Sequence, residues 1–275
     1  MLPRLAVSGV EGTATFMFRH RLVNSHKWSS VLLLILTICA VSLCVNGQTP
    51  RTPSDVVREF YKAMRERRFK DAWSMSVYKP AIEGLAADEM EDLRPFFEAQ
   101  AAPIPAQLQI DTEKISGDTA QVFVHLPPSD SSPQVTSKPV DLIKSDGRWI
   151  IGTQAEQDTV KKAGSRYFLD ALIDLNQDNM SDTLKRLIGM EAVYAQANSG
   201  AYGELKALVA AGLMSDDMFD PKLSGYTFRL TITGKTYVAA AEPTHYGRTG
   251  KLSYWMDQTG AIKSADNGGK PLAIK

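Results

Sequence analysis

Histidine is the residue type in this sequence best suited to general-base or metal chemistry, because its side chain titrates near neutral pH. His125 lies in the run Gln121–Leu126, where apolar and polar residues alternate as in a strand. It would share a face with Phe123, opposite Val122 and Val124. A general base also needs an orienting partner, and the sequence indicates none for His125. We therefore interpret His125 as a half-exposed sheet residue, with a catalytic base as the alternative.

Further polar candidates lie near the C-terminal end. His245 and Tyr246 precede Arg248 in a polar stretch that we interpret as an exposed loop, with a binding site as the alternative. Asp257 and the pair Asp266–Asn267 could suggest calcium, but their spacing does not match the compact acidic loop of an EF-hand. We therefore expect no metal site here.

Sequence motifs for other chemistries are missing as well. The chain contains no glycine-rich phosphate loop, HExxH helix or GxSxG elbow. Both cysteines, Cys39 and Cys44, lie inside one apolar run, so the chain after that run has no thiol. We expect no catalytic residue and no cofactor.

Residues 17–47 have the pattern of an export signal. A basic stretch precedes the apolar run 31–45, which is shorter than the roughly 20 residues of a spanning helix. Val45 and Gly47 are small enough at the −3 and −1 positions for cleavage before Gln48. We therefore expect a periplasmic or secreted protein. The basic residues are Arg19, Arg21 and Lys27.

Two alternatives to cleavage remain open. An uncleaved segment would anchor the protein in the inner membrane through residues 31–45, its one expected membrane contact. A lipoprotein signal would instead acylate a cysteine. Leu43 precedes Cys44, where such signals carry Gly or Ala, so lipidation of Cys44 is the weaker alternative.

The charge balance argues against a nucleic-acid partner. Without residues 1–47 the chain has 27 basic and 30 acidic residues, a net charge of −3. The densest basic stretch, residues 65–68, also contains Glu66 and fits the solvated end of a helix. We expect the partner to be an envelope protein or a small ligand.

Residues 51–153 are predicted to form an α+β domain, with helices first and a curved meander after them. Thr52, Pro53 and Asp55 form a helix start, and apolar residues follow at helical spacing. Trp73 belongs to a second short helix. A third helix is expected over residues 88–100, bent at Pro95, and strands over residues 108–110, 120–126, 140–144 and 148–151.

The segments TPSDVVREFYKAMRERRFKDAW and DLIKSDGRWIIG resemble the NTF2-like superfamily, also called SnoaL-like. This resemblance implies a cone-shaped α+β fold over residues 51–153. The family's cone usually holds a pocket, and some members are isomerases or cyclases that use an Asp or His there. Tyr61, Trp73 and His125 are therefore the pocket candidates, although helix-spaced aromatic residues are more typical of a core.

Residues 154–180 are predicted to be a helical connector, and residues 181–275 a second domain. A helix is expected from Thr159 to Leu175. The polar stretch 176–182 should break it, with a new cap at Ser181 or Asp182. The second domain is predicted to contain a helix that ends near residues 198–200 and a shorter helix over residues 202–211. Strands are then expected over residues 226–233, 236–241, 251–256 and 261–263.

The runs EAVYAQANSGAYGELKALVAAGLM, GYTFRLTITGKTY and THYGRTGKLSYWMDQTGAIK resemble the globular part of bacterial type IV pilins and pseudopilins. The resemblance implies a helix packed on a small antiparallel sheet. Members of that family assemble into fibres through an apolar half-helix directly before the globular part. Here the apolar run 31–45 contains no Glu, and a whole domain separates it from Leu184. We therefore expect a binding or docking module.

Together these features predict a non-enzymatic, exported bacterial envelope protein of binding or scaffolding type. Two alternatives stay open. One is a small-molecule enzyme, isomerase-like or cyclase-like, with His125 as the base in the cone. The other is an accessory component of a pilus or of a type II secretion apparatus.

Overall fold

The computed structural model describes residues 51–126 and 136–272. The predicted export segment, residues 17–47, and Cys44 lie outside the described residues, so cleavage and lipidation stay predictions. Within the described ranges, no helix combines the length and the apolar character that crossing a bilayer requires.

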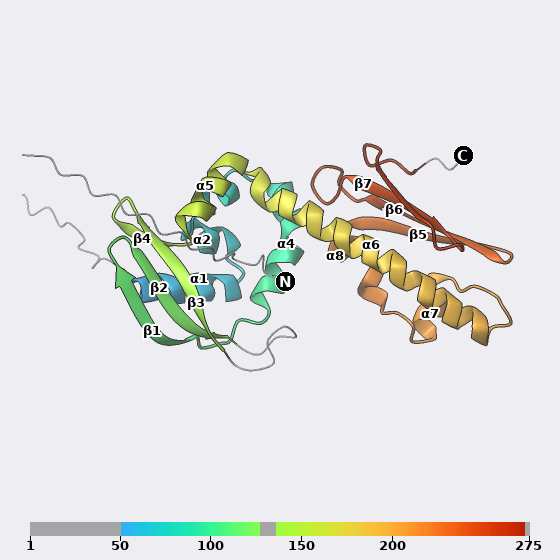
Figure 1. Cartoon of the computed structure of the whole chain (residues 1–275), viewed down its shortest axis with the longest axis horizontal. Coiled ribbons are helices and arrows are strands. Elements are labelled where there is room, and N and C mark those ends of the chain that lie inside the picture. The colour runs from blue at the N-terminus through green and yellow to red at the C-terminus, as the bar shows by residue number, and fades with distance from the viewer. Residues whose placement is uncertain (1–50, 127–135, 273–275) are drawn as a thin grey trace, which may run out of the picture. The chain divides into compact units, whose positions relative to one another are not determined.

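The described residues form a mixed α+β structure with two four-stranded antiparallel sheets, ordered β1-β2-β3-β4 and β5-β6-β7-β8 (Figure 1). The predicted α+β class is confirmed. The first elements are α1 (Pro53–Arg65), α2 (Phe69–Ser74), α3 (Lys79–Glu83), α4 (Ala87–Ala101), β1 (Gln109–Ser116), β2 (Thr119–Leu126), β3 (Thr136–Ser145) and β4 (Arg148–Ile151). The later ones are α5 (Gln154–Ala163), α6 (Arg166–Ala197), α7 (Leu205–Ala210), η1 (Asp216–Phe219), α8 (Pro221–Ser224), β5 (Tyr226–Thr233), β6 (Thr236–Pro243), β7 (Leu252–Asp257) and β8 (Ile262–Asp266).

Helix α1 begins where the sequence predicts. The Thr52 hydroxyl accepts a hydrogen bond from Asp55 N at 3.1 Å, and Asp55 Oδ2 accepts one from Thr52 N at 3.1 Å. This reciprocal capping box satisfies donors that the first helical turn would otherwise leave unpaired. Hydrogen bonds from the side chain and the backbone of Thr52 to the Asp55 carboxylate lower the pKa of Asp55, because they favour its ionised form. Pro53 occupies the first helical position, where no N–H is needed.

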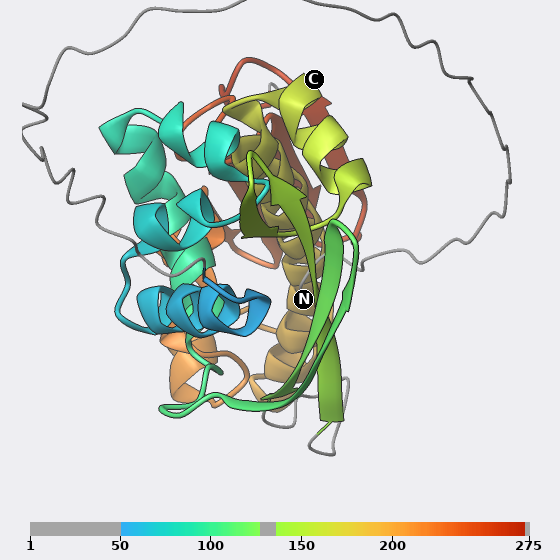
Figure 2. The same ribbon diagram turned by 90° about the vertical axis from the view of Figure 1, so that its left-hand side faces the viewer.

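The first sheet buries one face against the helices. Figure 2 shows α1 lying along one side of strands β1 to β3. Val56 and Val57 of α1 pack with Val122 and Val124 of β2 and with Leu142 of β3. All five side chains are buried, so apolar packing fills the space between α1 and the sheet.

Helix α4 matches the predicted third helix. Pro95 lies inside it, yet the helix continues to Ala101. A proline at this position removes one backbone hydrogen bond. Burial of Met90, Leu93 and Phe97 offsets that loss.

The helix break predicted at residues 176–182 is wrong. The chain breaks instead at Gly164, which has a φ of 57° and ends α5. Helix α6 then runs unbroken for 32 residues, so Ser181 and Asp182 lie in its interior rather than at a cap. The predicted boundary between residues 180 and 181 therefore falls within one helix.

Tertiary contacts explain why the polar stretch remains helical. Asn176 is buried, and its Nδ2 donates to Thr249 O at 2.9 Å. The Gln177 side-chain oxygen accepts from Leu252 N at 3.1 Å. Met180 belongs to the core beneath the second sheet. These contacts outweigh the weak helix propensity of the segment.

The second sheet shows the predicted alternation. In β5, Tyr226 is buried and the threonines are exposed. Tyr237 of β6 and Tyr254 of β7 join Leu184 and Leu187 of α6 in one core. The short elements η1 and α8, which precede β5, were not predicted because neither spans enough residues to show a period.

Candidate functional site

His125 has a carboxylate partner that the sequence did not reveal. Strand β1 carries a bulge at Asp111, because the register jumps from the pair Ile110–Val124 to the pair Thr112–Phe123. The bulged residue reaches His125, and the two atoms Nε2 and Asp111 Oδ2 lie 2.6 Å apart. A carboxylate in this position can fix the orientation of an imidazole.

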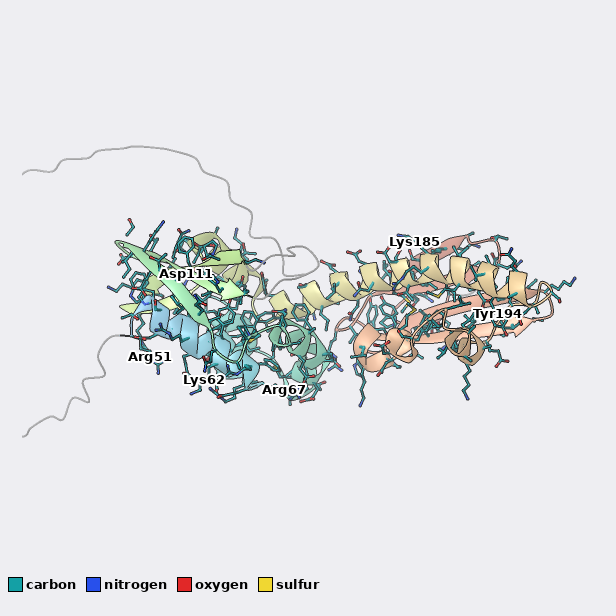
Figure 3. All side chains as sticks on the ribbon, turned by 90° about the horizontal axis from the view of Figure 1, so that it is seen from below. Arg51, Lys62, Arg67, Asp111, Lys185 and Tyr194 are labelled. Atoms are coloured by element: carbon teal, nitrogen blue, oxygen red, sulfur yellow. The ribbon has the colours of Figure 1, made fainter. Side chains whose placement is uncertain are left out.

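The His125–Asp111 pair lies on the face of the first sheet that turns away from α1. His125 alternates with Val122 and Val124, which face α1, so it lies on the other face of the sheet. Both side chains of the pair are half-buried. Figure 3 shows Asp111 on the first sheet. A base at this position would act on a ligand at this outer sheet face, not on one enclosed between the sheet and the helices.

Tyr61 and Trp73, the other pocket candidates, belong to the packed interior. Trp73 contacts the rings of Phe60 and Tyr78, each with a centroid separation of 5.4 Å. Tyr61 packs against the same cluster, and its burial raises its pKa to about 12. The Trp73 Nε1 donor has no hydrogen-bond partner among the described residues. These aromatic side chains contribute apolar packing to the core.

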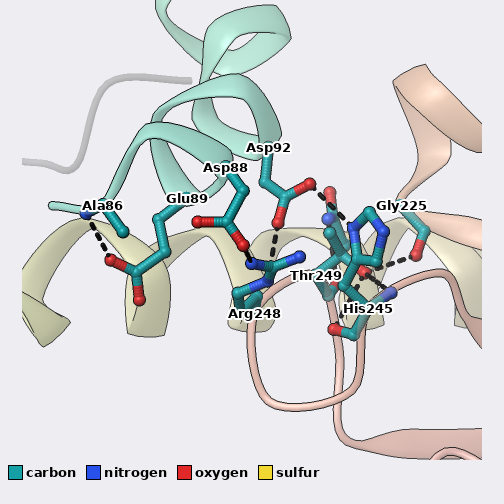
Figure 4. Close-up of polar contacts among 9 residues, drawn as sticks. Ala86, Asp88, Glu89, Asp92, Gly225, His245, Arg248 and Thr249 are labelled. Carbon is teal, nitrogen blue, oxygen red and sulfur yellow. Dashed lines mark hydrogen bonds and ion pairs between the residues drawn. The ribbon is translucent and has the colours of Figure 1, made fainter.

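The strongest polar arrangement lies between α4 and the loop joining β6 to β7 (Figure 4). His245 Nδ1 lies 2.8 Å from Asp92 Oδ1, and Arg248 Nε lies 2.9 Å from Asp92 Oδ2. Arg248 also pairs with Asp88. We call these four residues, Asp88, Asp92, His245 and Arg248, the clasp. It joins residues that are 153 to 160 positions apart in sequence.

The two carboxylates of the clasp have different environments. Asp88 and Asp92 are four residues apart on α4, so they project from the same face. The Asp92 side chain is only 10% exposed, whereas that of Asp88 is 67% exposed. Asp92 Oδ2 accepts no well-aligned hydrogen bond, so its contact with Arg248 is mainly electrostatic. The hydrogen bond from Arg248 lowers the pKa of Asp88.

A second set of hydrogen bonds holds the loop in shape. Thr249 Oγ1 donates to Gly225 O at 2.8 Å and accepts from His245 N at 3.0 Å. Asn176 of α6 donates to Thr249 O. Contacts with α6 and with Gly225, the residue before β5, therefore fix the loop independently of α4. The sequence placed His245, Tyr246 and Arg248 in a loop correctly, but it did not indicate the contact with α4.

The acidic residues considered for calcium serve local structure. Asp257 Oδ1 accepts from Thr259 N at 2.9 Å and closes the turn between β7 and β8. Asp266 Oδ1 accepts from the Tyr246 hydroxyl at 2.9 Å. Across residues 51–126 and 136–272, no group of three or more His, Cys, Asp or Glu residues is arranged to hold a metal.

No protein-family model matches the chain, and no curated protein matches it. A crystal structure from Campylobacter jejuni, described as an NTF2-like transpeptidase, is similar with 20% identity and a TM-score of 0.26. The match covers 37% of this chain and 97% of that one.

Proposed function

We propose that this protein is an exported, non-catalytic component of the bacterial envelope that acts as a binding scaffold. In this proposal an NTF2-like domain over residues 51–153 and a pilin-like domain over residues 181–275 present fixed surfaces to an envelope partner. The export pattern of residues 17–47 and the two sequence resemblances support it.

The clasp is the observation that carries the scaffold proposal. In the clasp, His245 and Arg248 hold the loop between β6 and β7 against α4. Both side chains are of types that could otherwise serve catalysis or ligand binding. Helix α6 contacts α4 as well as β7. A scaffold needs binding surfaces at fixed positions, and two independent connections between the halves would provide them.

Cross-linking in intact cells tests this proposal. A tagged full chain, expressed from its own locus, should cross-link to an envelope protein and fractionate with the envelope or periplasm. The cross-link should weaken in Asp92→Ala, which removes the buried part of the clasp. It should persist in the matched variant Asp88→Ala, which removes the exposed part. A cytoplasmic product, or equal cross-linking by both variants, would argue against the scaffold.

The His125–Asp111 pair supports a second candidate, a small-molecule enzyme with His125 as its base. The orienting carboxylate is present at 2.6 Å. The enzyme hypothesis expects His125→Asn and Asp111→Asn to fail in restoring the phenotype of a deletion strain. Gln121→Ala, on the same sheet face, should restore it. The scaffold hypothesis expects all three variants to restore it, provided that their melting temperatures are unchanged.

A further inference from the structure

A groove of about 780 Å³ lies between α6 and the segment formed by η1 and α8. Its lining includes the apolar side chains of Met180, Met218 and Leu223. Met180 is buried, Met218 is half-buried, and Leu223 is exposed. The volume falls within the range of about 300–1,000 Å³ that is typical of small-ligand sites. The groove therefore has room for a ligand and apolar surface to contact it.

Side chains of both charges line the groove. Lys185 and Asp182 of α6 pair with each other at 2.8 Å and largely cancel. Arg186 of α6 and Asp217 of η1 also line the groove. The hydrogen bond from Lys185 and, from a longer range, the charge of Arg186 lower the pKa of Asp182. No ion pair joins Arg186 or Asp217 to another side chain that the structure describes. One wall thus offers a guanidinium and the other a carboxylate.

We propose that this groove binds a short peptide with free termini. Arg186 would bind the peptide carboxylate, for which its planar donors are suited, and Asp217 would bind the terminal ammonium. The methionines and Leu223 would contact an apolar side chain between the termini, since methionine adapts to varied shapes. This assignment names a ligand class for the proposed binding function and rests on that function.

Charge distinguishes this ligand from other classes. A phosphate or nucleotide would be repelled by Asp217, and the Lys185 charge is already paired with Asp182. A fatty acid could use Arg186, but it would leave Asp217 without a partner. A zwitterion matches both unpaired charges, whereas each alternative matches one.

Calorimetry on the full chain tests the assignment. The probe is the free tripeptide Ala-Leu-Ala, compared with its N-acetylated, C-amidated form. The free form should bind, and capping should weaken binding about tenfold or more, because two charge-assisted hydrogen bonds are lost. Arg186→Gln and Asp217→Asn should each weaken binding of the free form by about tenfold. The matched controls Lys222→Gln and Asp174→Asn change exposed residues of α8 and α6 outside the lining and should leave binding unchanged.

Three results would overturn the groove assignment: no binding of the free peptide at millimolar concentration, equal binding of the capped peptide, or unchanged binding in both groove variants. These outcomes are separate from those that test the scaffold. An envelope-located protein with an inactive groove would overturn only the peptide site. A cytoplasmic protein that still binds the peptide would overturn only the envelope function.

Discussion

Replacing Asp92 with Ala should destabilise the protein far more than replacing Asp88 with Ala. Both carboxylates project from α4 toward Arg248, so the two variants remove the same chemical group from the same partner. They differ in exposure, with 10% for Asp92 and 67% for Asp88. Asp92 also contacts His245, which Asp88 does not. Asp88 also lies in the first turn of α4, where an acid favours the helix, so a larger loss in Asp92→Ala must come from burial and the second partner.

The expected loss for Asp92→Ala lies between two known limits. Exposed ion pairs contribute about 0.2–1 kcal/mol, and breaking a buried pair costs about 3–5 kcal/mol. The Arg248 side chain is 24% exposed, so water can partly solvate its charge after Asp92 is removed. We expect a loss of about 2 kcal/mol in the free energy of unfolding. In a chain of this size that corresponds to a decrease of roughly 4–8 °C in Tm.

Urea unfolding and thermal melts of the full chain provide the assay. Asp88→Ala should lower the midpoint and Tm much less than Asp92→Ala does. A double-mutant cycle between Asp92→Ala and Arg248→Ala should give a coupling of about 1–2 kcal/mol. Equal losses for the two aspartate variants, or a coupling near zero, would refute the reasoning that the clasp stabilises the structure through its buried carboxylate.

Three further predictions follow from single residues. Burial raises the pKa of Glu191 in the folded protein. Its neutral form therefore contributes stability at acidic pH, and this stability is lost as the pH rises through the pKa of the folded state. Glu191→Gln, which retains an acceptor for Gly203 N, should remove this decline; an unchanged pH profile of unfolding would contradict it. Phe97→Ala should cost about 3–5 kcal/mol in chemical unfolding because Phe97 is fully buried, and a loss below 1 kcal/mol would show that the cluster is loosely packed. Gly152→Ala should lower Tm, because Gly152 has a φ of 121° and an added Cβ would lie 2.5 Å from Val77; an unchanged Tm would mean that this backbone relaxes freely.

Local signals in the sequence were sufficient to predict most elements. The Thr52 cap, the proline after it and the acid at Asp55 act within one helical turn, so their outcome does not depend on distant residues. The alternation in β5 likewise reflects one buried and one exposed face. In contrast, the polar stretch around Asn176 remains helical because of contacts with residues more than seventy positions away.

The candidate sites depended on distant contacts and were predicted less well. His125 and Asp111 meet because of a one-residue bulge, which alternation alone does not reveal. Asp92 and His245 meet through packing between the two halves of the chain. In hindsight, two acids four residues apart on a helix that also buries apolar side chains could have indicated a docking face.

Intact mass spectrometry of the natively expressed protein, combined with cell fractionation, tests the central claim most directly. We predict a mature chain that starts at Gln48 and is found in the periplasmic or secreted fraction. A lipid-sized mass increment on Cys44, or retention of residues 17–47 in the membrane fraction, would instead identify an anchored envelope protein. A full-length product in the cytoplasm would contradict the account of an exported scaffold.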